Sequence, residues 1–276
     1  MADLSEGDSR PTLQLLLCLS YFSIVVSIST LPPCLPFLLT DEDLPGASEG
    51  LPRLIGLSSV AFLIGKLTLG WLTDRKGGLP ILVFAMAANV LLLLLISFSS
   101  HVLPFGALWL VECFVSSGCW GAVSKLTHDL FLRSEWAHVI GRVAAWSRLG
   151  TVFATYSFSS LLAHDFGWRV VFRLSALAQV LMLGYLARLS VTQVLSKTTS
   201  KNGENATNTS FETHWRILHR ILIDSRFWFM FIAKIAFMIV WQFSSFVPLY
   251  LSAGPMAMSS HIRAIAASLF PVSVPP

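Results

Sequence analysis

The chain has 276 residues, of which 54% are hydrophobic and only 12% are charged. An ordinary soluble domain carries about twice that share of charged side chains, so the composition excludes such a domain and indicates a membrane protein. The formal net charge of +4 comes from residues that lie between apolar runs rather than in one basic stripe, which argues against a nucleic-acid partner.

The N-terminus and the cysteines carry no processing or metal-binding signature. The first residues, MADLSEGDSRP, are acidic, unlike a signal or transit peptide, so the apolar run from Leu13 is expected to stay in the protein as its first span. The four cysteines lie in apolar runs without CxxC spacing, and we expect buried free thiols at Cys18, Cys34, Cys113 and Cys119.

Seven apolar runs are each long enough to cross a bilayer core of about 30 Å as a helix. They are separated by polar or turn-rich segments and lie at 13–39, 54–72, 79–98, 103–123, 143–163, 170–189 and 227–251. The first run carries Pro32, Pro33 and Pro36 near its end. Because proline lacks an amide donor, we expect the helix proper to end near Thr30, with a kinked segment beyond it.

A polar segment between the sixth and seventh runs divides the chain. It has no sustained apolar period until a short amphipathic stretch that begins at Trp215, so we expect a flexible linker and then a helix on the membrane surface. The predicted organisation is a cytosolic tail at 1–12, a six-helix unit at 13–190, a cytosolic linker at 191–226, a seventh transmembrane helix at 227–251 and a tail at 252–276.

Lys and Arg residues in the loops predict the orientation, because cytosolic loops of membrane proteins are enriched in them. If the N-terminus is inside, the inner loops carry eleven of these residues and the outer loops carry four. The bias predicts a cytosolic N-terminus. It also argues against a seven-helix receptor, which fits the helix count but would place its N-terminus outside.

The loop after the second run carries the most specific pattern of the chain, GKLTLGWLTDRKGG. Gly70 is expected to allow close helix contact, and Asp74 to accept hydrogen bonds or pair with a basic side chain. Arg75 and Lys76 are expected to anchor a short loop at the inner face.

With Gly77, these residues resemble the loop signature that major facilitator superfamily transporters carry between helices two and three, although Gly78 stands where a basic residue is usual. A second segment, FGWRVVF at 166–172, is similar to a motif at the outer turn between helices five and six of that superfamily. The resemblance implies an all-α membrane protein, a six-helix major facilitator half-bundle plus a seventh transmembrane helix.

Lys66 stands within the second predicted span, near one helix face with Gly70 and Asp74. An uncompensated ammonium in the bilayer costs about 3 kcal/mol or more. Lys66 is therefore expected either to face protein or a water-filled path, or to snorkel towards the inner headgroups. Its spacing resembles the organophosphate/phosphate antiporter branch of the superfamily, in which the corresponding lysine lines the route of an anionic substrate.

In that branch, arginines on helices one and seven bind the phosphate group bidentately, and this chain lacks both of them. Its first span has no basic residue, and its seventh has Lys234 but nothing basic near Val240, where the resemblance would place the arginine. The resemblance therefore does not extend to a phosphorylated substrate, and an organic anion or an uncharged solute stays open.

Glu112 and Arg148 are internal charges of helices four and five. Glu112 is either a substrate-path group, as a proton site or a partner for a basic residue, or a structural hydrogen-bonding group between helices. Arg148 either pairs with an acid such as Glu112 or Asp129, or binds substrate. Trp120 and Trp146 join them as substrate-path candidates, because these two helices line the cavity in the family.

Lys125 and Asp129 lie at i and i+4 near the inner end of the fourth run. We expect an ion pair that helps to hold a gate, together with the loop residues Gly70, Asp74, Arg75 and Gly77. The fifth run lacks the Gly- and Pro-rich series typical of drug/proton antiporters, which argues against a multidrug exporter. No HExxH, P-loop or GxSxG pattern occurs, so we expect neither an enzyme nor a metal or cofactor.

The predicted function is transmembrane transport of a small solute by alternating access between two six-helix halves. An organic anion is the candidate solute. Because the second half is largely missing after the seventh span, we expect the activity to be compromised in this chain alone. The alternative is a non-transporting form that regulates or assembles with a full-length transporter. A second copy of the chain or a full-length relative is a further expected partner. The expected partners are the lipid bilayer and a small solute.

Overall fold

The computed structural model describes residues 9–41, 44–190 and 223–244, and every regular element in these ranges is a helix. The helices are α1 (Ser9–Ile28), α2 (Leu31–Thr40), α3 (Ala47–Lys76), α4 (Gly78–Ser97), α5 (Val102–Ser116), α6 (Cys119–Leu130), α7 (Trp136–Ala163), α8 (Trp168–Ser190) and α11 (Ser225–Ser244). The all-α prediction is confirmed.

Five stretches of the described residues are long and apolar enough to cross a membrane. They are Pro11–Leu39, Ala47–Lys76, Gly78–Ser97, Val102–Leu130 and Trp168–Arg188. The predicted fifth span is the helix α7, which falls outside this group because Arg142, Arg148 and several hydroxyl side chains lower its hydropathy. The multi-pass prediction is therefore confirmed.

The chain divides into two compact units, and α11 lies in the second, which is described by itself. It is a single helix of 20 residues in the region predicted as the seventh span. The amphipathic stretch at Trp215, most of the predicted linker and the tail at 252–276 lie outside the described residues.

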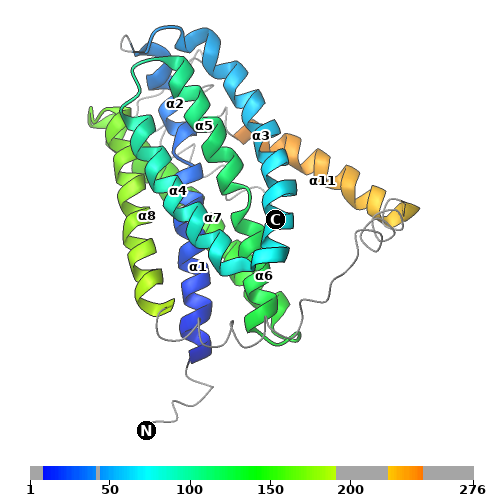
Figure 1. The fold of residues 1–276 in the computed structure, drawn as a ribbon. Helices are drawn as coiled ribbons and strands as arrows, with labels where there is room; N and C mark the ends of the chain where they lie inside the picture. The colour runs from blue at the N-terminus through cyan, green and yellow to red at the C-terminus, as the bar shows by residue number, and fades with distance from the viewer. Residues whose placement is uncertain (1–8, 42–43, 191–222, 245–276) are drawn as a thin grey trace. The chain divides into compact units, whose positions relative to one another are not determined.

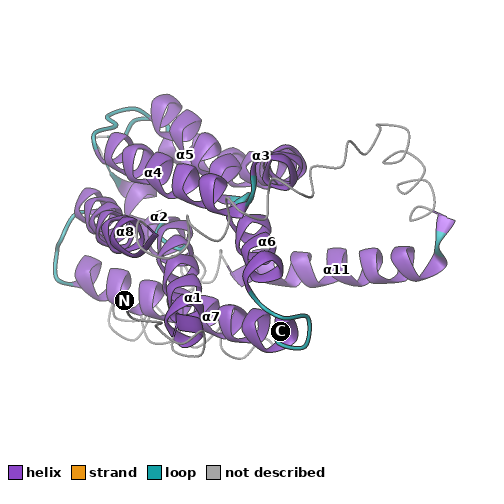
Figure 2. Cartoon of the chain, turned by 60° about the horizontal axis from the view of Figure 1, so that its bottom comes forward, coloured by secondary structure: helices purple, strands orange, loops and turns teal. Residues whose placement is uncertain are grey.

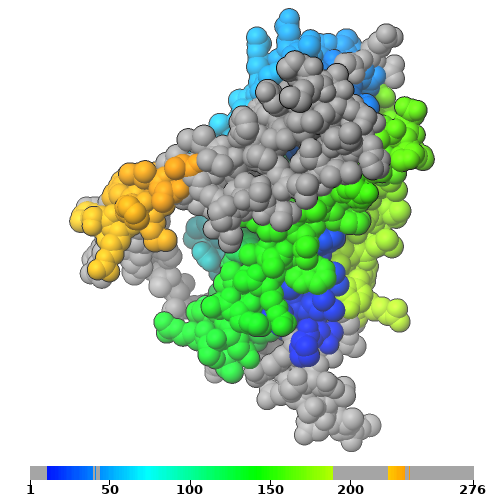
Figure 3. Space-filling model, turned by 180° about the vertical axis from the view of Figure 1, so that it is seen from behind, coloured from blue at the N-terminus to red at the C-terminus, as the bar shows by residue number. Residues whose placement is uncertain are grey.

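The helices of the first unit form two packed groups (Figures 1 and 2). In one group α3 packs against α5 and α6, and α4 packs against the same two helices; in the other, α1 and α2 pack against α7. Seen from behind, the surfaces of α7 in green, α1 in blue and α8 in yellow-green lie side by side (Figure 3).

Helix α4 shows that the outer surface of this unit suits lipid. Its sequence is apolar apart from Asn89 and the terminal Ser97: Leu82 and Met86 are fully buried, whereas Leu91 and Phe84 are 59% and 55% exposed. A helix with this composition is not stable against water on its outer face, so the exposed leucines indicate a hydrocarbon environment.

Two of the predicted spans are broken in the middle. The first span is divided between Ile28 and Leu31, which confirms the break that the prolines predicted near Thr30. Pro32 lies in the first turn of α2, where its missing N–H costs no hydrogen bond. The break between α5 and α6, at Ser117 and Gly118, was not predicted.

Candidate functional site

Helix α3, which carries the loop motif, has two chemically different faces. Gly65 and Leu69 are buried on the side of α5 and α6, whereas Lys66 and Asp74 are exposed. A Cβ atom at Gly65 would lie 2.2 Å from Ser117 Oγ of the α5–α6 break. Glycine is therefore required where the two helices cross.

Gly70 does not make the close helix contact predicted for it. A Cβ atom there would meet no heavy atom of the described residues within 4 Å, whereas a Cβ atom at Gly118 would lie 2.7 Å from Leu69 Cβ. Gly65 and Gly70 are five residues apart, about 140° around a helix, so they cannot both face α5. The close approach uses Gly65 and Gly118 instead.

A single residue, Gly77, connects α3 to α4. Its φ of 89° and ψ of 162° lie in a region that glycine alone adopts readily, and its N–H donates to Thr73 O at 2.9 Å. At the next residue, Gly78, a Cβ atom would lie 2.4 Å from Ala122 O of α6. The chain departs from the usual basic residue here because α4 packs too closely on α6 to admit a side chain.

Aromatic rings hold two basic side chains of the motif. The Arg75 guanidinium carbon lies 4.0 Å from the centroid of the Trp71 ring, and Lys66 Nζ lies 5.0 Å from that of Phe62. Asp74 is exposed at the end of α3, and the hydrogen bond or ion pair predicted for it is not formed with any described residue.

Three predicted substrate-path residues meet α1 at neighbouring positions. The ring of Trp120 on α6 lies 5.2 Å from that of Tyr21, and the ring of Trp146 on α7 lies 6.0 Å from that of Phe22. Arg148 on α7 is close enough to Tyr21 to act on it electrostatically. The structure thus brings together an aromatic and cationic group on α1, α6 and α7, which we call the α1 cluster.

The α1 cluster was only half predictable. Trp120, Trp146 and Arg148 were found as residues of helices four and five, but Tyr21 and Phe22 were not. A helix with little amphipathic character gives no signal of which face its aromatic residues occupy, and only the packing of α1 against α7 reveals it.

Glu112 lies away from solvent, in a hydrogen-bonded group between α5 and α4. The Ser116 hydroxyl donates to Glu112 Oε1 at 2.9 Å, and Asn89 Nδ2 donates to Ser116 Oγ at 2.8 Å. All three side chains are buried, Glu112 completely. Asn89 and Ser116 were not predicted, although an amide in the apolar run of α4 is a signal that could have been used.

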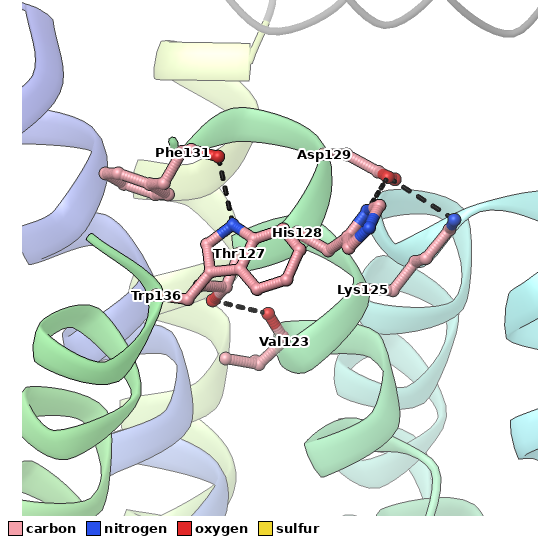
Figure 4. Close-up of polar contacts among 7 residues, drawn as sticks. All are labelled: Val123, Lys125, Thr127, His128, Asp129, Phe131 and Trp136. Atoms are coloured by element: carbon pink, nitrogen blue, oxygen red, sulfur yellow. Dashed lines mark hydrogen bonds and ion pairs between the residues drawn. The ribbon is translucent and has the colours of Figure 1, made fainter. Parts of the chain in front are cut away.

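Lys125 and Asp129 form the predicted ion pair, with Nζ 3.3 Å from Oδ1 (Figure 4). The same Asp129 oxygen lies 3.2 Å from His128 Nδ1, and the His128 ring lies 4.6 Å from the Trp136 ring of α7. Trp136 in turn donates its Nε1–H to Phe131 O at 3.0 Å. These contacts fix the turn between α6 and α7.

The GWR segment ties the start of α8 to the end of α2. Trp168 donates its Nε1–H to Asp41 Oδ2, and Arg169 Nη1 lies 3.6 Å from the same oxygen. Trp168 also packs edge-on against Phe105 and Phe172. Asp41, directly after α2, thus has a specific basic partner in Arg169.

A polar seam between α1 and α8 was not predicted. Gln179 Nε2 donates to Ser27 Oγ at 2.9 Å and to Ser23 O at 3.1 Å, and Thr30 Oγ1 donates to Ser175 Oγ at 3.2 Å. These contacts hold together the first and sixth predicted spans. Such seams replace the hydrophobic driving force that helices lack in lipid.

Comparison with known proteins identifies the family. A sequence model described as Major Facilitator Superfamily matches residues 17–274. A curated relative, the multidrug resistance protein MdtG of Rahnella sp. (strain Y9602), is 28% identical over 182 residues, which cover 62% of this chain and 42% of that protein. The chain thus covers less than half the length of this relative. Since the family match spans nearly the whole sequence, the chain belongs to the major facilitator superfamily.

Proposed function

We propose that this chain takes part in alternating-access transport of a small organic solute across a membrane. The observation that carries the proposal is the α1 cluster, because its residues come from the first, fourth and fifth spans of a superfamily member. Alternating access rocks one six-helix half against the other around a site between them. The helices α1 to α8 would form one of these two halves.

The α1 cluster favours a solute with an apolar or aromatic body and an anionic group. Trp120 and Trp146 offer ring faces and edges for the body, and Arg148 offers a bidentate donor for a carboxylate or similar group. Lys66 is the proposed second contact for the anion, on the exposed side of α3.

A multidrug substrate range is the second candidate. It is favoured by the name of the MdtG relative, and it replaces the organophosphate branch, whose phosphate-gripping arginines this chain lacks. A carrier of this second kind would take up apolar cations and neutral compounds as readily as anions, whereas the first candidate would discriminate by charge.

We further propose that the N-terminus is cytosolic, so that the α3–α4 turn and the Lys125–Asp129 ion pair lie at the inner end and act in gating. The loop residues Asp74, Arg75 and Gly77 would belong to that gate. An epitope placed at the N-terminus should be reached by antibody in cells only after permeabilisation. Labelling of intact cells would contradict this orientation.

Reconstitution of the purified chain in liposomes tests the function. Uptake of a panel of radiolabelled anionic, neutral and cationic organic solutes should show a preference for the anions. Equal uptake of all three classes would favour the multidrug candidate. Absence of uptake by the chain alone, together with uptake when a full-length relative is added, would support the non-transporting, assembling form.

A further inference from the structure

Arg173 of α8 is an exposed cation that the end of α4 holds in place. Its Nε donates to Ser97 Oγ at 3.3 Å, and its guanidinium carbon lies 5.0 Å from the centroid of the Phe98 ring. Ser97 is buried, and its own hydroxyl donates to Leu94 O at 2.7 Å. One edge of the guanidinium group is thus fixed by a committed hydroxyl, and its plane lies near a ring.

The charge of Arg173 has no acidic partner among the residues that the structure describes. Arg169, one turn earlier on α8, pairs with Asp41, which also accepts from Trp168. No ion pair of this kind is formed by Arg173 within the described ranges. Because an arginine also carries N–H donors on both Nη atoms, these donors are left for an anion from outside the described chain.

An exposed apolar stripe begins at Arg173 and runs along α8. Leu177, Val180 and Leu181 follow at i+4, i+7 and i+8, so they share one helix face with Arg173. All three side chains are exposed. The cation therefore stands at the head of a surface that suits hydrocarbon.

Helix α4 presents a matching stripe. Leu94 and Leu91 lie four and seven residues before Phe98, and all three are exposed. Figure 1 shows the end of α4 close to the beginning of α8, where the Ser97–Arg173 hydrogen bond joins them. Both stripes start at this polar contact, so together they are complementary to a molecule with an anionic head and an apolar body.

We propose that the α4–α8 contact binds a phospholipid of net negative charge. The phosphate group accepts hydrogen bonds from the Nη atoms of Arg173, and the acyl chains lie along the two apolar stripes. The inference goes beyond the proposed function, because the site lies apart from the α1 cluster and binds a component of the membrane rather than the transported solute.

The chemistry of Arg173 favours an anionic phospholipid over other occupants. A planar guanidinium group binds phosphate through two parallel hydrogen bonds, and basic sites between membrane helices bind anionic headgroups. A zwitterionic headgroup would bring a second positive charge beside a cation that pairs with no described acid. An arginine that only snorkels to the headgroups would not need the fixed Nε–Ser97 contact.

Native mass spectrometry of the full chain tests the site without any transport assay. The chain is released from micelles that contain equal amounts of dioleoyl-phosphatidylglycerol and dioleoyl-phosphatidylcholine. The wild type should retain phosphatidylglycerol at least several-fold more often than phosphatidylcholine. Arg173→Gln should abolish this preference, whereas Arg53→Gln, at an exposed arginine of α3, should keep it. Ser97→Ala should weaken the preference, because Nε loses its acceptor.

Competition separates a lipid from a soluble anion. Inorganic phosphate in tenfold excess should not displace phosphatidylglycerol from the wild type, since it has no acyl chains for the stripes. Displacement by inorganic phosphate would overturn the lipid assignment. So would equal retention of the two lipids by the wild type, or a preference that Arg173→Gln leaves unchanged.

Arg173→Lys keeps the test decisive if Arg173→Gln fails to fold. Lysine keeps the positive charge but lacks the planar pair of donors, so this variant should retain only part of the preference for phosphatidylglycerol. An undiminished preference in Arg173→Lys would contradict the bidentate phosphate contact.

Discussion

Single glycines decide how closely the helices of this unit approach one another. Gly65 and Gly118 lie at the α3–α5/α6 contact, and Gly78 lies against α6. Their roles differ from that of Gly77, which is needed for a backbone conformation rather than for space. In lipid, close approach of this kind increases van der Waals contact, which is the main attraction available between helices.

Gly65→Ala should destabilise the unit by about 1–3 kcal/mol, because the new methyl group would overlap Ser117 Oγ and the backbone oxygen of Phe114. The midpoint of thermal unfolding in detergent measures the effect. Gly70→Ala is the matched control on the same helix, and it should leave the midpoint unchanged or raise it, since alanine is the better helix former. Equal losses in both variants would show that the α3–α5 crossing is not tight at Gly65.

At the scale of elements, a polar contact at the junction of α2 and α8 ties distant parts of the chain together. Asp41 follows α2 and receives the Trp168 N–H and the Arg169 guanidinium from the start of α8. The contact joins the end of the first predicted span to the start of the sixth. It therefore holds together two elements that are far apart in sequence.

Asp41→Asn should lower the free energy of unfolding by about 0.2–1 kcal/mol. The loss is small because the ion pair is partly exposed and the asparagine oxygen can still accept a hydrogen bond from Trp168. A double-mutant cycle with Arg169→Gln should give a coupling energy of similar size. Asp165→Asn, at an exposed residue of the loop before α8, is the control and should leave the free energy of unfolding unchanged. Purely additive losses in the cycle would mean that the Asp41–Arg169 pair contributes nothing.

The α1–α8 seam is the second element-scale contact. Gln179→Leu would remove the hydrogen bonds to Ser23 and Ser27, and polar contacts between membrane helices contribute about 0.6 kcal/mol on average. We therefore expect the free energy of unfolding to fall by about 0.6 kcal/mol, which a lower midpoint of thermal unfolding would report. Val180→Leu, on the exposed side of α8, should have no effect, and a comparable loss there would indicate a general weakness of α8.

At the scale of the whole molecule, two basic residues on different helices are proposed to face the solute. Lys66→Ala and Arg148→Ala should each lower uptake of anionic solutes in liposomes at least several-fold, with little change for neutral solutes, because a positive charge attracts only the anions. Arg53→Ala, at an exposed residue of α3, is the control. If Lys66→Ala leaves uptake of every anion unchanged, Lys66 snorkels to the headgroups and the path role is wrong.

The sequence by itself determined the membrane class, the order of the helices and the family. The lengths and polarity of the apolar runs follow from the thickness of a bilayer. Loop motifs such as the one ending at Gly77 depend on local backbone chemistry. Both features can therefore be recognised from residues that are neighbours in the sequence. The Lys125–Asp129 pair was predictable for the same reason, since i and i+4 residues meet on any helix.

Only the tertiary structure decided which side of each helix meets which neighbour. In apolar helices such as α4, no alternation of polar and apolar residues marks a face, so the pairing of Asn89 with Ser116 and Glu112 could not be derived. The same limit led to the wrong role for Gly70. The contact of α1 with Trp120 and Trp146, on which the proposed solute path depends, likewise exists only after α1 has packed against α7 and α6.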